Sequence, residues 1–281
     1  MPRRAHTVVK VATHAALAIA TLVAAGCATH PPRAHGTSAP GAGGVEPAPA
    51  TAARAPSFLV RSFTPVENAA IEPLRAADFL DEAAAPREIA VIAGDREGER
   101  RIIAVESSAD GTTVLTETGD AGVERTVLRR RADGGLTLLS VDTPGEDSRS
   151  VFESGLTYAP DELMAGATVE SASPMRVTLL SSQRERSTGR AKRTMRIVGT
   201  AAVEVSGEPL EATVVETEFD ARLDAARAQR RATLYVVRGR GVVAERWEER
   251  VVVLGIFPRN SSETTVALPA TTAIDDTKDA P

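Results

Sequence analysis

The stretch TLYVVRGRGVVAERWEER, residues 233–250, decides the fold class of this 281-residue chain. Two runs rich in β-branched and aromatic residues flank Gly239-Arg240-Gly241, and short glycine-containing connections of this kind join antiparallel strands. Trp247 stands between charged residues in the second run, which is typical of a strand with one buried and one solvent-facing side. The stretch therefore predicts a β-hairpin.

Two earlier turns, near Ser206-Gly207 and Ala225-Ala226, extend this hairpin to a meander of four strands. We expect the strands at 190–205, 208–223, 229–238 and 241–250. Antiparallel pairing about each turn gives one apolar face and one face of alternating charge, with large side chains pointing inward. The apolar row contains Thr194, Phe219, Ala232 and Trp247, and the charged row contains Arg193, Asp220, Arg231 and Glu248.

The upstream part of the body shows the same punctuation. Strand-length runs between residues 98 and 153 are separated by Asp110-Gly111, Gly119-Asp120 and Asp133-Gly134-Gly135. Apolar residues at helical spacing predict one short helix at 73–85, which Pro86 ends. We therefore predict a mainly β protein, with an antiparallel meander that forms a curved sheet, half-barrel or sandwich.

The amino terminus has the pattern of an export signal. A basic start precedes an apolar run of about 15 residues, shorter than the roughly 20 that span a bilayer. Ala24-Ala25-Gly26-Cys27 resembles the lipobox of bacterial lipoproteins, although Ala24 replaces the usual leucine. The resemblance implies that signal peptidase II cleaves before Cys27, which then carries acyl chains; an ordinary signal that leaves Cys27 as a free thiol is the alternative.

The expected organisation follows from these segments. Residues 1–26 are a signal peptide, 27–56 a lipidated cysteine with a disordered Pro/Ala/Gly-rich tether, 57–268 one β-rich domain and 269–281 a flexible tail. In the lipoproteins that the chain resembles, Asp after the cysteine favours the inner membrane. Ala28 therefore favours the periplasmic face of the outer membrane.

A second resemblance concerns the carboxyl-terminal half. TLYVVRGRGVVAERWEE and Pro160-Asp-Glu-Leu163-Met-Ala-Gly166 resemble segments of exported bacterial β-rich domains of unknown function. More distantly, this half is similar to lipoprotein carriers and receptors of the Lol type, which wrap a curved sheet around acyl chains. The resemblance implies a half-open barrel with no assigned chemistry.

Composition excludes several kinds of site. From Ser57 onward the chain has neither His nor Cys, which excludes Ser-His-Asp and Cys-His catalysis and zinc sites built from these residues. We therefore expect no enzyme, although chemistry by carboxylates alone stays open. We also expect no cofactor, because the residues after Gly239-Arg240-Gly241 form a strand and not the helix that a dinucleotide site needs. The net charge of −5 argues against nucleic acid as a partner.

One basic cluster is a candidate binding surface. It surrounds a turn expected at Ser187-Thr188-Gly189 and fits lipid phosphates, peptidoglycan carboxylates or another envelope protein, unless it is simply a solvated hairpin tip. Its members are Arg184, Arg186, Arg190, Lys192 and Arg193.

Three functions stay open at this point. The first is a lipid-anchored envelope protein with a non-catalytic binding or structural role, and the second is a periplasmic carrier of an acyl chain or another hydrophobic ligand, with the 73–85 helix as a lid. The third is an enzyme that uses carboxylates alone. A continuous apolar cavity inside the sheet favours the carrier, a filled interior favours the first function, and a buried pair of acids without basic neighbours favours the enzyme.

Overall fold

The computed structural model describes residues 55–80 and 86–268. The expected signal peptide, Cys27, all but the last two residues of the tether and the tail from 269 lie outside these ranges. The strands are β1 (Phe58–Pro65), β2 (Arg87–Gly94), β3 (Arg100–Ser107), β4 (Thr112–Gly119), β5 (Gly122–Arg130), β6 (Leu136–Thr143), β7 (Ser148–Ala159), β8 (Thr168–Leu179), β9 (Glu185–Val205), β10 (Glu208–Leu223), β11 (Ala226–Val237), β12 (Gly241–Val253) and β13 (Phe257–Ala267).

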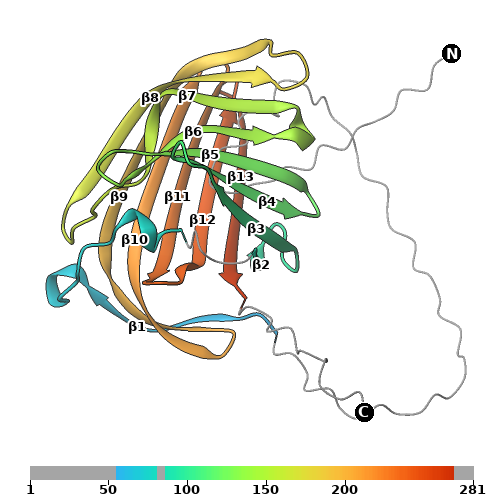
Figure 1. The fold of residues 1–281 in the computed structure, drawn as a ribbon. Helices are drawn as coiled ribbons and strands as arrows, with labels where there is room; N and C mark the ends of the chain where they lie inside the picture. The colour runs from blue at the N-terminus through green and yellow to red at the C-terminus, as the bar shows by residue number, and fades with distance from the viewer. Residues whose placement is uncertain (1–54, 81–85, 269–281) are drawn as a thin grey trace, which may run out of the picture.

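Strands β2 to β13 form a closed antiparallel barrel of 12 strands. Consecutive strands pair from β2 to β13, and β13 pairs with β2, which closes the ring. β8 covers the first part of one edge of β9, over 185–196, and β1 covers the rest of that edge, over 199–205. In Figure 1, β3 to β6 run across the direction of β11 to β13. The prediction of a mainly β, antiparallel protein is confirmed, and the half-barrel and the sandwich give way to a closed barrel.

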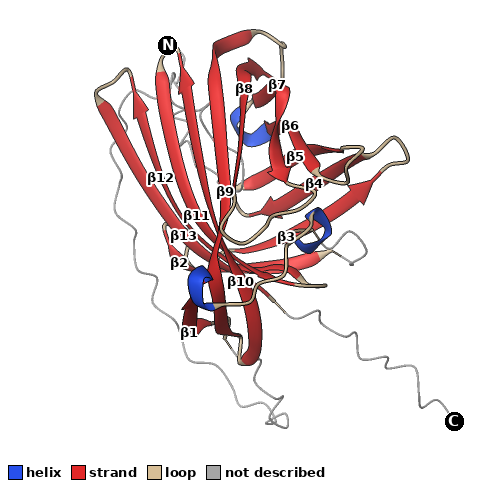
Figure 2. Cartoon of the chain, turned by 90° about the vertical axis from the view of Figure 1, so that its left-hand side faces the viewer, coloured by secondary structure: helices blue, strands red, loops and turns tan. Residues whose placement is uncertain are grey.

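The helix expected at 73–85 is wrong for the residues that the structure describes. Between Pro73 and Leu80 the chain makes one 3-10 turn, η3 (Ala76–Asp78), and no described segment forms a helix of 7 or more residues. Leu74 instead pairs with Leu163 in an isolated bridge, and both side chains are fully buried. Burial against the barrel thus outweighs the local helical spacing. Figure 2 shows η3 with the other 3-10 turns, η2 (Val66–Asn68) and η4 (Pro144–Glu146), as the short helices of the described chain.

β9 carries a β-bulge at Val198. Val214 pairs with Gly199 and Val215 pairs with Ile197, so Val198 has no partner on β10. A bulge places two residues opposite one, so the alternation of side chains on the bulged strand changes relative to its partner. The two parts of β9 therefore present odd-numbered residues to opposite faces of the sheet.

The bulge overturns part of the predicted face assignment. Thr194 was expected beside Phe219 on the inner face, but Arg193 is the residue that pairs with Phe219. The outer face carries Thr194 instead, opposite Glu218. Across β10 and β11 the pairing differs from the prediction by two residues, since Phe219 opposes Arg230 and not Ala232. A shift of two keeps every side chain on its predicted face.

Two apolar clusters lie on the two faces of the sheet. Leu234 and Val236 belong to the larger cluster inside the barrel, whereas Tyr235 between them belongs to a smaller one outside. Neighbouring strand residues point to opposite faces, which explains the division. The ring of Phe58 packs edge-on against Tyr235 at 4.7 Å, so β1 helps to cover the outer cluster.

The outer face of β9 to β12 carries ion pairs. Arg196 donates to Glu216 at 2.6 Å and Arg231 lies 3.1 Å from Glu218, each across a strand boundary. Such exposed pairs contribute at most about 1 kcal/mol each, and mainly favour one register. The outer face of these strands therefore alternates in charge as predicted, except that Arg193 is not part of it.

None of the described helices has the length and apolar character needed to cross a membrane.

Candidate ligand-binding site

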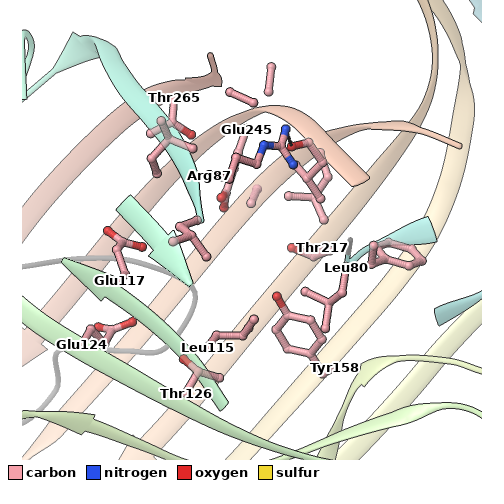
Figure 3. A pocket seen from close by; sticks show the side chains of 18 of the residues that line it. Leu80, Arg87, Leu115, Glu117, Glu124, Thr126, Tyr158, Thr217, Glu245 and Thr265 are labelled. Atoms are coloured by element: carbon pink, nitrogen blue, oxygen red, sulfur yellow. Dashed lines mark hydrogen bonds between the residues drawn. The ribbon is translucent and has the colours of Figure 1, made fainter. Parts of the chain in front are cut away.

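The barrel encloses a cavity of about 190 Å³. Its walls come from both halves of the barrel, from β2 to β7 and from β9 to β13 (Figure 3). An engineered apolar cavity of about 150 Å³ is large enough to bind benzene, so this one has room for a small organic molecule.

Most of the cavity wall is apolar. Leu115, Leu138 and Leu234 contribute aliphatic side chains from three strands. Phe79 and Leu80 add apolar surface from the segment after η3, and both are buried. This segment belongs to the stretch predicted as a helical lid, and its described part after η3 is irregular chain and not a helix.

Arg230 stands on the wall formed by β11. Its side chain is buried, its Nη2 donates to Glu245 at 2.7 Å, and its guanidinium lies over the ring of Trp247 at 4.5 Å from the centroid. The ion pair and the ring together fix the position of the guanidinium. Its Nη1 is buried and has no hydrogen-bond partner among the described residues.

Arg193 lies two strands away, in the same row of the sheet. Phe219 pairs with Arg193 on one side and with Arg230 on the other, so both arginines share the lumen face with this ring. The guanidinium of Arg193 lies 5.2 Å from the centre of the Tyr158 ring. Burial lowers the pKa of Arg193, although an arginine stays charged in proteins.

Two carboxyl groups face the cavity from β4 and β5. Glu117 and Glu124 are directly paired across these strands, and Figure 3 shows their side chains next to each other. Burial raises the pKa of Glu117 to about 8, partly offset by Arg101. Burial and the neighbouring Glu117 also raise the pKa of Glu124 well above its usual value. A pKa of about 8 keeps Glu117 mainly protonated at neutral pH, and the shift of Glu124 favours its protonated form as well.

A buried ionic cluster lies beside this pair. Arg101 is almost completely buried and contacts Glu99 at 2.9 Å, Glu263 at 3.0 Å and Glu117 at 3.5 Å. The acid pair thus has a basic neighbour, so the condition set above for an enzyme of carboxylates alone is not met. Within residues 55–80 and 86–268, no group of three or more His, Cys, Asp or Glu residues is arranged to hold a metal ion.

Of the five basic residues predicted as one binding surface, Arg193 is separated from the others, because it lines the cavity. Arg184 lies in the β8–β9 turn, whereas Ser187-Thr188-Gly189, the expected turn, lies inside β9. Lys192 is exposed and pairs with Glu170 at 2.7 Å on the outside of the barrel. The side chain of Arg193 points into the lumen. Arg186 and Arg190 also lie on β9, one half-buried and the other exposed.

Sequence reasoning missed Glu117, Glu124 and Arg230. A signal was present, because each lies an even number of positions along its strand from an apolar residue of the inner face: Leu115 on β4, Leu128 on β5 and Ala232 on β11. A charged residue at an inward position indicates either an internal ion pair or a ligand. Which of the two applies depends on the opposite wall, which the sequence of one strand does not specify.

Fold and site together define a class of protein, an antiparallel β-barrel with a mainly apolar cavity that contains a few charged groups. No protein-family model matches the chain, and no curated protein or solved structure matches it significantly.

Proposed function

We propose that this protein is a lipid-anchored envelope protein that binds a small hydrophobic molecule inside its barrel. The observation that carries the proposal is the mainly apolar cavity of about 190 Å³. Eight-stranded barrels are just wide enough to be filled by side chains or to hold one small ligand, and diameter grows with strand number. A barrel of 12 strands therefore has space for a ligand even with large side chains in its lumen.

The charged outer face supports a barrel that stands in water. Lys192, Arg196, Glu218 and Arg231 all project outward from β9 to β11. A lysine or arginine on the lipid-facing side of a membrane barrel costs about 2–4 kcal/mol at the bilayer midplane. The apolar side chains here lie mainly inside, which is the reverse of a membrane barrel.

Fluorescence provides a direct test, because Trp247 is the only tryptophan and lies buried in the barrel. We expect the neutral dye N-phenylnaphthylamine to bind and to quench Trp247 by energy transfer. Ala232→Phe, which adds a ring to the cavity wall, should abolish this binding. Thr233→Phe adds the same ring to the next residue, on the outer face, and should leave binding unchanged. Absence of dye binding, or equal effects of both variants, would contradict the proposal.

The proposed anchor is tested separately. Mass spectrometry of the mature protein should show an acylated cysteine as its first residue. Two or more acyl chains on that residue would hold the protein stably to a bilayer. Cys27→Ala should move the protein from the membrane fraction to the soluble fraction. An unmodified Cys27 in membrane-bound wild-type protein would contradict the anchor and leave the ligand proposal intact.

A further inference from the structure

The cavity wall contains more cationic than anionic charge. Arg87, Arg193 and Arg230 line it, together with Glu245 and the pair Glu117 and Glu124. The raised pKa values of this pair favour its uncharged form. The three guanidinium groups then outnumber the one other carboxyl group of the wall, that of Glu245.

Two of the three guanidinium groups have unused donors. No described residue accepts a hydrogen bond from Arg193 or forms an ion pair with it. Its guanidinium lies against the Tyr158 ring and is within electrostatic range of Glu245 and Arg230. Arg230 is 6% exposed, and its Nη1 has no hydrogen-bond partner among the described residues. Arg87 differs, since it donates to the backbone carbonyls of Arg240 and Val242. A buried donor without a partner costs about 1–3 kcal/mol, and more for a charged group.

The opposite wall contributes a third donor. β5 and β11 are six strands apart in the ring of 12, so Glu124 and Arg230 face the lumen from opposite sides. Glu124 is 5% exposed, and its Oε2 has no hydrogen-bond partner in the described chain. Burial favours the protonated form of this carboxyl group, which is a hydrogen-bond donor. Arg230 and Glu124 thus have buried donors without a partner, and the half-buried Arg193 offers further donors to the same lumen.

We infer that the ligand carries one carboxylate group, which Arg193 and Arg230 bind while its hydrocarbon part lies against Leu115, Leu138 and Leu234. A carboxylate is an acceptor only, and its planar pair of oxygens matches guanidinium donors. The same lumen offers an apolar surface for the chain. This inference rests on the proposed binding function and adds the chemistry of the ligand.

Decanoate and 1-decanol test the head group, since they share one alkyl chain and differ in charge. Each competes with N-phenylnaphthylamine for the full-length protein, with Trp247 energy transfer as the readout. We expect decanoate to bind the wild type about tenfold more tightly than decanol, the ratio that roughly 1.4 kcal/mol of charged hydrogen bonding produces. Arg193→Met should remove this preference and leave decanol binding unchanged. Arg193→Lys keeps the positive charge and should therefore retain part of the preference for decanoate.

Lys192→Met is the matched control, because it removes one positive charge from the adjacent residue on the outer face. It should keep the preference for decanoate. Equal binding of decanoate and decanol by the wild type would overturn the carboxylate inference while supporting hydrophobic binding. If Arg193→Met and Lys192→Met weaken the preference for decanoate equally, the proposed role of Arg193 is overturned. If neither compound nor the dye binds, the proposed function itself fails.

Discussion

Arg193 and Phe219 lie directly opposite each other on β9 and β10, and both side chains face the lumen. Their pairing depends on the bulge at Val198, which changes the alternation of β9 relative to β10. Without the bulge, Arg193 would join the outer ion pairs and the cavity would lose one cation. One unpaired residue thus changes both the register and the electrostatics of the barrel interior.

Truncation of Trp247 should strongly destabilise the fold. The side chain is 1% exposed and supports the guanidinium of Arg230. Trp247→Ala should lower the free energy of unfolding by about 3–5 kcal/mol, measured by chemical denaturation with circular dichroism. Glu248→Ala changes the exposed neighbour on the same strand and should cost less than about 0.5 kcal/mol. A similar effect of the two variants would contradict the inward orientation of Trp247.

Removal of the buried guanidinium of Arg101 should also cost much stability. Arg101→Met removes the most buried cation of the cluster and leaves Arg96, 3.5 Å from Glu99 and 2.6 Å from Glu263, as the cation that stays. Loss of one partner from such a cluster costs about 3–5 kcal/mol. Arg100→Met is the control, since Arg100 is exposed and its pair with Glu88 is worth less than about 1 kcal/mol. The two variants should differ clearly in urea midpoint, and equal midpoints would exclude a structural role for this cluster.

The raised pKa of Glu117 predicts that stability falls as pH rises. The folded protein holds a proton on Glu117 up to about pH 8, whereas the unfolded chain releases it near the ordinary glutamate pKa of 4.5. Between these values the folded state binds more protons, so the free energy of unfolding decreases with pH, by at most about 1.4 kcal/mol per pH unit for one proton. Glu124 acts in the same direction. The groups that act on Glu117 are Arg101, Arg96, Glu124, Glu245 and Glu263.

Glu117→Gln should therefore flatten the decline between pH 5 and 8, measured as the urea midpoint at several pH values. Glutamine mimics the protonated carboxyl group, so the variant should match the wild type near pH 5 and exceed it near pH 8. Glu218→Gln, on the exposed face of β10, should leave the slope unchanged. If the urea midpoint of the wild type rises steadily from pH 5 to pH 8, the raised pKa of Glu117 is contradicted.

Gly199 occupies a position with no room for a side chain. A Cβ atom there would lie 2.3 Å from the carbonyl oxygen of Thr64 on β1 and 2.8 Å from the ring of Phe63. Gly199→Ala should therefore cost about 1–3 kcal/mol, since β1 or β9 has to shift. At Gly145 the nearest atom would be 3.6 Å away, so Gly145→Ala should be nearly neutral. Equal thermal midpoints for the two variants would contradict the close approach of β1 to the bulge.

Much of the barrel could be predicted from local sequence. The limits expected for the strand at 208–223 coincide with β10, and the turns near Ser206-Gly207 and Gly239-Arg240 are present. The inward direction of Phe219 and Trp247 follows from the period of two along a strand, which needs no knowledge of distant residues. The lipidated Cys27, the export signal and the envelope location stay predictions, because they fall on residues that the structure does not describe.

The sequence by itself determined an antiparallel β protein with apolar and charged faces, because alternation is a local property that each strand carries alone. Tertiary structure decided the closure of the barrel, since β13 and β2 meet only after more than 160 intervening residues fold. It also decided the bulge at Val198, the loss of the helix near Ala76 and the position of Arg193 in the cavity. Each depends on packing against other strands or segments of the barrel, and that packing outweighs the local pattern at these points.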